Sequence, residues 1–535
     1  MKFDKQFDVL IAGAGASGCA LAAKLADARP DWKIALIEAG PRKPNLIVRM
    51  PLGIAFTVAE PNDYNYAYET TPQPGLNGRR GYQPRGRGVG GSSLINAMCA
   101  IRGRPSDFDG WANDGCPGWS WDDLLPVFKR IETNSRGASE LHGDQGPLHV
   151  SDLQAPNPVT RLLIQAMVEA GINENPDFNG PTQEGCGIYQ VYQKNGRRHD
   201  VGTAYLSKKR RNLTILSETR VNRVLTENGR AIGLTVRQGD KEKNLGAREE
   251  VILAGGAFGS PQLLLLSGIG PADELKAHGI SVVADRPSVG KNLHDHLDHI
   301  TPVIGKLPGT LGGKLKTLIQ MALASPQYFL SGDGPLTSNS AEAGAFIKSR
   351  PDLAEPDLQL HSAIAIVDDH GRKIYDKQGV SLHVCGLDPK SRGQVTLASA
   401  DPKDAPLIDP AYLAVEEDLD TLVRGTRICQ QIMMSPSFQK YKFTPAYEPF
   451  DAPDHVLRDQ IRDRADTIYH PVGTCRMGSD PDAVVTPRLT VNGIERLRVV
   501  DASVMPKVVS GNTEWASVVI GEKAADMIVE DHRTA

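Results

Sequence analysis

The chain has 535 residues, which is too long for one compact core and predicts two domains. Its 40% hydrophobic and 23% charged residues are typical of a soluble globular protein. A net charge of −4 offers no basic surface for nucleic acid, so we exclude nucleic acid as a partner. The seven cysteines are scattered without a C-x-x-C pair, which argues against a disulfide framework or a zinc site.

Hydropathy gives expectations about localisation. No run of about twenty apolar residues occurs, and the N-terminus leads directly into a predicted strand without the apolar segment of a signal peptide. We therefore expect a cytoplasmic protein with no integral membrane span. Peripheral membrane attachment stays open, because a surface helix leaves little trace in composition. A homo-oligomer stays open as well.

The first motif lies at residues 7–18, where an apolar strand runs into a G-x-G-x-x-G turn and then a small-residue helix. Gly13 allows the tight turn, Gly15 lets a pyrophosphate approach the backbone, and Gly18 lets the helix pack against the strand. A second apolar strand ends in Glu38, where a carboxylate can bind a ribose hydroxyl. These residues predict a dinucleotide site, although a glycine turn with only a packing role is the alternative.

A second glycine-rich stretch follows at residues 85–96. Its glycines, serines and apolar residues predict another close approach of the backbone to a ligand, with a helix beginning there. A flexible surface loop is the alternative, but Leu94, Ile95 and Met98 are too apolar for a solvated linker. Upstream, alternating tyrosines at residues 64–68 predict a short half-buried strand.

The remaining periodicity predicts further strands and helices. One buried strand enters a helix that Ser260 caps, in which Pro261 occupies the first turn, and which Gly268 ends. The region from 300 to 464 has alternating strand-like segments without a nucleotide turn, which is typical of an antiparallel sheet. The other predicted strands span 212–216, 220–225, 231–236, 249–254, 358–361, 380–384 and 497–501, and the other predicted helices span 159–170 and 515–529.

Five stretches, in order, carry a resemblance over essentially the whole chain. The sequence resembles the glucose-methanol-choline (GMC) family of FAD-dependent oxidoreductases, and within it the choline and alcohol dehydrogenases. The matching stretches are 13–18 with Glu38, 86–109, 256–270, 289–296, and 470–478 followed by 500–503 and 511–512.

The resemblance implies a fold and a domain organisation. It implies an α/β protein with a discontinuous Rossmann-like FAD-binding domain and an α+β substrate domain whose sheet is mostly antiparallel. We expect the FAD-binding domain to comprise residues 1–155, 206–300 and 465–535 and the substrate domain to comprise 156–205 and 301–464.

The resemblance also implies residue roles. His470 would lie beside the reactive nitrogen of the flavin, Asn512 would be the second active-site residue, and Asn96 would lie along the isoalloxazine ring. Members that bind FAD covalently carry His before this Asn, but here Ile95 precedes it, so we expect non-covalent FAD. The implied cofactor-binding set is Gly13, Gly15, Ala16, Ser17, Gly18, Glu38, Ala39, Gly90, Ser92, Asn96, Ala97, Met98, Val221, Gly255, Asp501, Ala502, Asn512 and Thr513.

Alcohol oxidation explains why these residue types are needed. A flavin accepts the hydride, while a general base whose pKa lies near neutrality takes the hydroxyl proton, a task suited to histidine. Asn512 would hold the substrate oxygen within reach of His470. An isolated His470 is typical of a structural histidine, and Asn512 suits a turn, but the motif that follows His470 favours catalysis.

A cluster of imidazoles and carboxylates at residues 294–299 could supply metal ligands. It lies inside a stretch that is not a metal site in the family, so we expect no metal there. Its residues are His294, Asp295, His296, Asp298 and His299, and we expect them to make hydrogen bonds at a domain boundary.

The sequence therefore predicts oxidation of a primary alcohol to the aldehyde, with electrons passed to a quinone-type acceptor, another carrier or oxygen. An aryl-alcohol or sugar oxidase of the same family and a non-redox flavin-containing lyase are the alternatives. The intact His470 and Asn512 argue against a non-catalytic binding protein. No motif in residues 300–464 singles out one alcohol.

Overall fold

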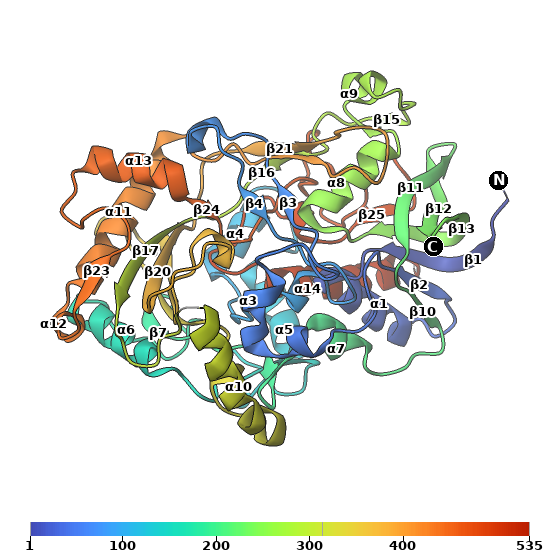
Figure 1. Ribbon diagram of the computed structural model, residues 1–535. Helices are drawn as coiled ribbons and strands as arrows, with labels where there is room; N and C mark the ends of the chain where they lie inside the picture. The colour runs from blue at the N-terminus through green and yellow to red at the C-terminus, as the bar shows by residue number, and fades with distance from the viewer. Residues whose placement is uncertain (1, 313, 534–535) are drawn as a thin grey trace.

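The computed structural model describes residues 2–312 and 314–533. Two large sheets lie at opposite sides of the molecule, one near the chain termini and one beside the helices α11 (Glu416–Met433) and α13 (Asp454–Arg464) (Figure 1). This arrangement confirms the predicted α/β fold class, with a Rossmann-like sheet and a second, antiparallel one. None of the described helices is both long and apolar enough to cross a membrane.

The first sheet has a parallel core, which explains its apolar strands. Such strands are covered on both faces, so they are apolar throughout, as the four buried residues of β2 are. An antiparallel hairpin extends one edge. The parallel strands are β10 (Leu213–Leu216), β2 (Ile34–Ile37), β1 (Lys5–Ala12), the end of β13 (Lys241–Leu253) and β25 (Leu497–Val499), and the hairpin strands are β11 (Arg220–Glu227) and β12 (Arg230–Gln238).

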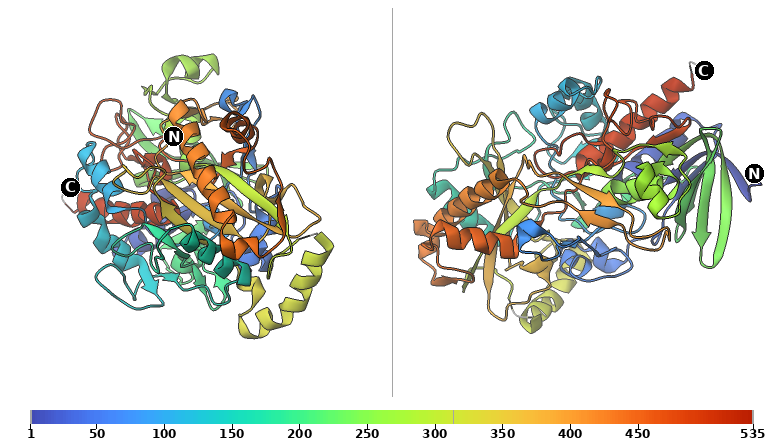
Figure 2. Two further views of the ribbon diagram at one scale, coloured as in Figure 1. Left: turned by 90° about the vertical axis from the view of Figure 1, so that its left-hand side faces the viewer. Right: turned by 90° about the horizontal axis from the view of Figure 1, so that it is seen from above.

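The first and last helices pack against each other beside this sheet. The hydroxyl of Ser17 in α1 (Ala16–Ala28) donates to the carbonyl oxygen of Ser517 in α14 (Glu514–Asp531) at 2.7 Å. The helices approach closely because a Cβ on Gly521 would lie 2.3 Å from the carbonyl oxygen of Ser17. Both chain ends therefore meet at the first sheet, as the closing strand and helix predicted (Figure 2).

The second sheet is antiparallel throughout, as predicted. Helices α11 and α6 (Pro158–Glu169) pack on it. One edge strand comes from much earlier in the chain than the others, so the sheet combines separated segments. Its strands are β23 (Phe443–Pro445), β17 (Leu297–Gly305), β20 (Gly379–Gly386), β19 (Leu358–Ala363), β18 (Ala341–Ile347), β7 (Gly185–Ile188) and β24 (Asp466–Thr467).

Shorter elements connect and cover the two sheets. The helices are α2 (Leu46–Arg49), α3 (Ile54–Thr57), α4 (Pro105–Asn113), α5 (Trp121–Ile131), α7 (Val201–Leu206), α9 (Ala272–Ala277), α10 (Lys314–Ser331) and α12 (Pro436–Gln439). The strands are β3 (Tyr68–Glu69), β4 (Tyr82–Gln83), β5 (Glu132–Asn134), β6 (Leu148–Val150), β8 (Gln193–Lys194), β9 (Arg197–Arg198), β14 (Ile269–Gly270), β15 (Ala284–Asp285), β16 (Lys291–Leu293), β21 (Gly393–Thr396) and β22 (Leu407–Asp409).

The alternating tyrosines do not form the predicted strand. Of these tyrosines only Tyr68 lies in a strand, β3, which pairs with β4, because Ala67 adopts a φ of +50° that interrupts the extended backbone. The rings of Tyr66 and Tyr68 stack instead, with their centroids 5.2 Å apart. Both tyrosines line the cavity described below.

The predicted cap of the helix after β13 is also wrong. Helix α8 (Gly256–Leu266) begins before Ser260, so Ser260 and Pro261 lie inside it. Proline has no N–H for the carbonyl of Ala257, and the hydroxyl of Thr474 donates to that carbonyl at 2.6 Å instead. The end of the helix agrees with the prediction, since Gly268 follows it with a φ of +80°.

Candidate active site

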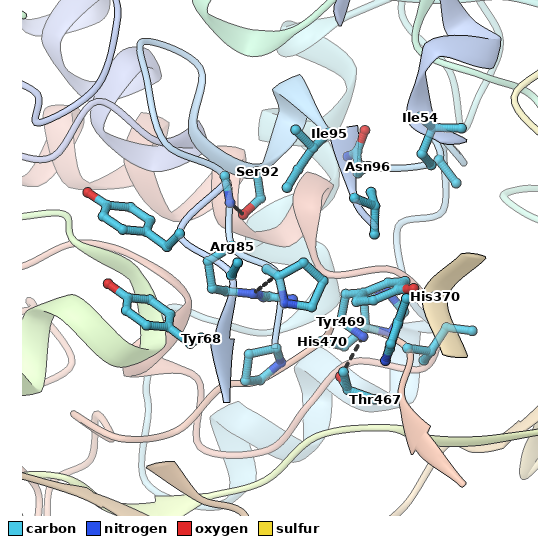
Figure 3. A pocket seen from close by; sticks show the side chains of 18 of the residues that line it. Ile54, Tyr68, Arg85, Ser92, Ile95, Asn96, His370, Thr467, Tyr469 and His470 are labelled. Atoms are coloured by element: carbon cyan, nitrogen blue, oxygen red, sulfur yellow. Dashed lines mark hydrogen bonds between the residues drawn. The ribbon is translucent and has the colours of Figure 1, made fainter. Parts of the chain in front are cut away.

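One cavity of about 1470 Å³ joins the glycine-rich turn of the first sheet to His470 and Asn512. Figure 3 shows side chains from several distant segments around it. Of the predicted site residues, all but Gly18 and Gly90 line it. The predicted residues that line it are Gly13, Gly15, Ala16, Ser17, Glu38, Ala39, Ser92, Asn96, Ala97, Met98, Val221, Gly255, His470, Asp501, Ala502, Asn512 and Thr513.

The carboxylate of Glu38 is fixed by backbone amides at the end of the cavity beside the glycine-rich turn. Its Oε1 accepts from the N–H groups of Gly40 at 2.8 Å and Gly88 at 3.0 Å, and its Oε2 accepts from Ala14 at 3.0 Å. Burial raises the pKa of this carboxyl, and the amides oppose the rise. Because an oxygen with one bonded donor can accept another, Oε2 is suited to a ligand hydroxyl.

The two glycine-rich loops meet through their backbones. The N–H of Gly90 donates to the carbonyl oxygen of Ala14 at 2.8 Å. A Cβ on Gly91 would lie 2.6 Å from the Cα of Gly15, and one on Gly18 would lie 2.1 Å from the carbonyl oxygen of Gly13. Gly18 and Gly90 thus contribute through backbone packing, and residues next to them line the cavity.

Near this junction Asn96 is held by Arg198 and Glu514. Nη1 of Arg198 donates to the backbone oxygen of Asn96 at 2.7 Å and to its Oδ1 at 2.9 Å, while Nδ2 of Asn96 donates to Oε2 of Glu514. Burial raises the pKa of Glu514 to about 7. Its Oε1 is buried without a hydrogen-bond partner among the described residues.

At the other end of the cavity, a chain of hydrogen bonds fixes the protons of two histidines. Nε2 of His296 lies 3.2 Å from the carbonyl oxygen of Leu387, which only accepts, so this nitrogen carries the proton. The Nδ1 of a neutral His296 is then an acceptor, and His470 Nδ1 donates to it across 3.0 Å. Nε2 of His470 is therefore unprotonated.

Burial supports this protonation state. Desolvation is the main cause that lowers the pKa of His470 well below its usual value, and His296 lowers it further. Burial also lowers the pKa of His296 to about 4. Both rings are neutral near pH 7, as the tautomers require.

Asn512 contacts the unprotonated nitrogen of His470. Its Nδ2 lies 3.1 Å from Nε2 of His470, and its Oδ1 accepts from Nε2 of Gln359 at 3.3 Å. The acceptor role of Oδ1 toward Gln359 leaves the amide nitrogen to face His470. The side-chain orientation of Asn512 is thus set by both neighbours.

Asp295 fixes the backbone of His470. Its Oδ1 accepts from the N–H of His470 at 2.8 Å, and its Oδ2 accepts from the hydroxyls of Tyr412 at 2.6 Å and Thr467 at 2.5 Å. Asp295 belongs to the histidine and aspartate cluster that the sequence singled out. Its contacts are the kind of protein hydrogen bonds that we expected of that cluster.

The rest of the cluster is also engaged with protein groups. His294 accepts from the N–H of Val508 at 2.9 Å, Asp298 lies 2.7 Å from Nδ1 of His383, and His299 lies 3.0 Å from the hydroxyl of Thr426. These partners come from distant parts of the chain.

Several residues of the site escaped sequence reasoning. Gln359 lies on a strand of the second sheet, and Arg198 lies on a two-residue strand, so no local pattern marks either one. His370 contacts the hydroxyl of Tyr469 through Nδ1 at 2.7 Å. His296 did have a signal, because it lies within the histidine and aspartate cluster, but its contact with His470 joins residues far apart in sequence.

The cavity fits FAD. Backbone amides and glycines without side chains surround its first end, as a pyrophosphate requires. A neutral imidazole and an amide face its other end, where a flavin ring and a substrate would meet. A single continuous cavity serves both parts of the cofactor.

Comparison with known proteins agrees with this geometry. The family profile of the GMC oxidoreductases matches residues 7–298 with its N-terminal part and residues 389–521 with its C-terminal part. An alcohol dehydrogenase (acceptor) of Pseudomonas putida is 45% identical, and the match covers 98% of this chain and 96% of that protein. An oxygen-dependent choline dehydrogenase of Pseudomonas syringae is 39% identical, over 99% of this chain and 94% of that protein.

Solved structures agree as well. The crystal structure of a pyridoxine 4-oxidase from Mesorbium loti superposes with a TM-score of 0.88 at 30% identity, covering 98% of this chain and 99% of that one. The chain therefore belongs to the GMC family of FAD-dependent oxidoreductases, as its sequence motifs implied, and is an enzyme of that class.

Proposed function

We propose that the protein oxidises a primary alcohol to the aldehyde. The observation that carries this proposal is the unprotonated Nε2 of His470 beside the amide of Asn512, in the cavity that begins at the glycine-rich turn. FAD, when bound, supplies the hydride acceptor that the reaction needs.

The residues of this chain supply the proton chemistry. Nε2 of His470 accepts the hydroxyl proton, and its Nδ1–H stays bonded to His296. Nδ2 of Asn512, which now donates to His470, donates to the substrate oxygen and holds it near the base. The low pKa of His470 keeps the base ready at neutral pH.

The apolar part of the cavity lining favours an uncharged alcohol over a quaternary ammonium alcohol. Ile54, Leu318, Met321 and Ile366 supply apolar surface to the cavity. A quaternary ammonium group would be stabilised by an unpaired carboxylate, but four of the aspartates that line the cavity have cationic or imidazole partners. The pairs are Asp298 with His383, Asp368 with Lys373, Asp369 with Arg372, and Asp466 with Arg79 and His370.

We propose that FAD is held non-covalently, because Ile95 offers no nucleophile for a bond to the flavin. Acid precipitation would then release all the flavin into the supernatant. Flavin retained in the precipitated protein would contradict this part of the proposal.

The reaction is tested by mixing the yellow protein anaerobically with alcohols. We expect a primary alkanol to bleach the flavin faster than choline does. Admission of either oxygen or a quinone dye then identifies the electron acceptor by which reagent restores the colour. A flavin that no alcohol bleaches would contradict the proposal and favour a lyase.

The role of His470 is tested by His470→Ala. We expect the variant to retain its flavin but to bleach roughly 10²–10⁴-fold more slowly, the usual contribution of a general base. His455→Ala, on the exposed surface of α13, is the matched control. Equal bleaching rates in both variants would remove His470 from the mechanism.

A further inference from the structure

Helix α10 exposes an apolar face to solvent. Residues 317–331 contain no charged residue. Leu323 is 77% exposed, Phe329 55% and Leu330 89%, whereas Tyr328 on the opposite side is buried. The helix projects from the body of the molecule (Figures 1 and 2). A surface helix of a soluble protein normally shows the opposite pattern, with its apolar side inward.

The apolar surface continues beyond α10 onto neighbouring elements. The hydroxyl of Tyr328 lies 3.5 Å from the carbonyl oxygen of Arg49, which ends α2, and Leu46 in the first turn of α2 is 69% exposed. Phe56 in α3 is exposed as well. We call the outer face of α10 with these residues of α2 and α3 the apolar platform.

Basic residues border the apolar platform. Arg49 is exposed at the end of α2, and Lys194 and Arg197 are exposed on the β8–β9 hairpin. The hairpin reaches the C-terminal end of α10, where a Cβ on Gly196 would lie 1.8 Å from the carbonyl oxygen of Gly332. Positive charge therefore gathers at this border, although the whole chain has a net charge of −4.

We propose that the apolar platform docks on the surface of an anionic lipid bilayer. A helix with a wide apolar face and basic neighbours lies in the plane of the bilayer interface, with its apolar side chains among the acyl chains. A protein partner would bring polar groups that need hydrogen-bond partners in the interface. The outward side chains of α10 are almost all hydrocarbon and offer few such partners. The basic border complements anionic headgroups.

The position of the cavity gives this docking a use. Phe56 and Leu318 are exposed and also line the cavity, so the cavity opens at the edge of the apolar platform. Docking would bring this opening to the bilayer, in which apolar alcohols and quinones dissolve. That use rests on the proposed function, whereas the docking itself does not.

The test is flotation of the flavin-loaded full chain with lipid vesicles, without substrate. We expect binding to vesicles of phosphatidylcholine mixed with phosphatidylglycerol, weaker binding to phosphatidylcholine alone, and weakening by salt. The double variant Leu323→Glu with Leu330→Glu should lose at least about tenfold in vesicle binding, because each leucine that enters the acyl region contributes a factor of about this size. These side chains are exposed and do not line the cavity.

Two further variants complete the design. Val282→Glu with Val283→Glu adds the same charge at side chains that are 38% and 42% exposed beside β15, far from α10 in Figure 1, and should bind vesicles as the natural chain does. Lys194→Ser with Arg197→Ser should lower binding only to the vesicles that contain phosphatidylglycerol.

Three outcomes would overturn the proposal. The first is that the natural chain binds none of the vesicles, and the second is that the α10 variant binds them as well as the natural chain does. The third is that neither chain binds vesicles, while the natural chain is a dimer and the α10 variant is a monomer. The last outcome would assign the platform to a second copy of the chain. If the chain fails to bind vesicles but alcohols bleach its flavin normally, the proposed function stands and the docking fails. If it binds vesicles but no alcohol bleaches its flavin, the docking stands and the proposed function fails.

Discussion

A single carbonyl determines where the proton lies between His296 and His470. Because the oxygen of Leu387 accepts from Nε2 of His296, Nδ1 of His296 must accept from His470, which leaves Nε2 of His470 unprotonated. His296 is therefore a positioning residue. It selects the tautomer of His470 in which the bare nitrogen faces Asn512.

Replacement of His296 tests this role. We expect His296→Phe to keep its flavin but to lower the rate of flavin bleaching by about tenfold, the value of one buried hydrogen bond. With His470 as the proposed base, bleaching slows as pH drops through the pKa of His470, and this acidic limb of the pH profile should shift in the variant because His296 contacts the ring of His470. The pH profile of bleaching measures both effects.

The control for this variant is His299→Phe, which removes another buried histidine of the same cluster whose partner is Thr426. It should leave the acidic limb unchanged. A merely structural role for His296 would give the two variants the same pH profile.

Glu514 carries a second residue-scale prediction. Its pKa is about 7 in the folded chain, against about 4.3 in an unfolded one, so the folded chain binds the extra proton between these values. The contribution of this group to stability therefore falls as pH rises from about 4.3 to 7. Glu514→Gln keeps an acceptor for Asn96 but removes the ionisation.

We expect the Tm of Glu514→Gln, relative to the natural chain, to be higher at pH 8 than at pH 5. Thermal unfolding monitored by flavin fluorescence at both pH values measures this. Glu60→Gln on an exposed turn is the matched control. A difference that stays the same at both pH values would mean that Glu514 is already ionised at pH 5.

At the scale of elements, helix α8 depends on a residue outside it. Pro261 leaves the carbonyl of Ala257 without its helical donor, and the buried Thr474 supplies the missing hydrogen bond from the segment that follows His470. This contact joins the helix that follows β13 to the loop that carries His470.

Thr474→Val tests this contact with little change in shape. The variant leaves a buried carbonyl unsatisfied, so we expect the free energy of unfolding to fall by about 1–3 kcal/mol. Thr444→Val, at an exposed position of β23, is the control and should change it little. Urea unfolding measures both, and equal stability of the two variants would show that another donor satisfies Ala257.

Sequence patterns predicted those features of the fold that are fixed by residues close together in the chain. The turn from Gly13 to Gly18 was predictable from the spacing of its glycines, since Gly18 approaches the carbonyl oxygen of Gly13 within the turn, although the close contact of Gly13 is with the distant Ala254. The start of α8 was not predictable, because the hydroxyl of Ser260 donates to Asp501, far along the chain, from a position inside the helix. Gln359 was equally invisible, because only the second sheet places it beside Asn512.

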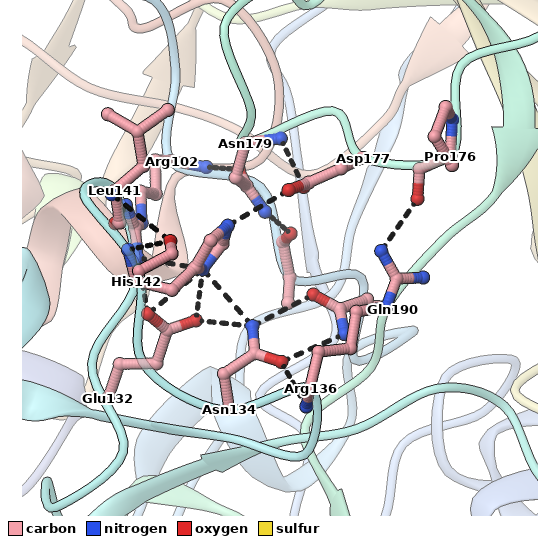
Figure 4. A network of polar contacts seen from close by, with 12 residues as sticks. Arg102, Glu132, Asn134, Arg136, Leu141, His142, Pro176, Asp177, Asn179 and Gln190 are labelled. Atoms are coloured by element: carbon pink, nitrogen blue, oxygen red, sulfur yellow. Dashed lines mark hydrogen bonds and ion pairs between the residues drawn. The ribbon is translucent and has the colours of Figure 1, made fainter.

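At the scale of the whole molecule, a buried polar network joins segments that are far apart in sequence (Figure 4). Arg102, which follows the second glycine-rich stretch, pairs with Glu132 at 2.5 Å, and both side chains are fully buried. His142 lies 3.0 Å from Glu132 and 3.0 Å from Asp177. The network therefore links the chain after Asn96 to the loop before β7.

The charge of His142 makes the stability of this network depend on pH. Burial alone would lower the pKa of His142, but hydrogen bonds to Asp177 and Glu132 outweigh burial and raise the pKa to about 9. A histidine whose pKa is raised on folding stabilises the fold fully below its unfolded pKa of about 6.5, and this contribution is lost as pH rises toward 9.

His142→Gln should therefore be less stable than the natural chain at pH 6, by an amount on the order of 1–3 kcal/mol. We expect the difference to shrink as pH rises and to be smallest above pH 9, where the natural histidine has lost its proton. Urea unfolding at several pH values measures it. A difference that does not change with pH would mean that His142 is neutral in the fold and that the network depends on shape and not on charge.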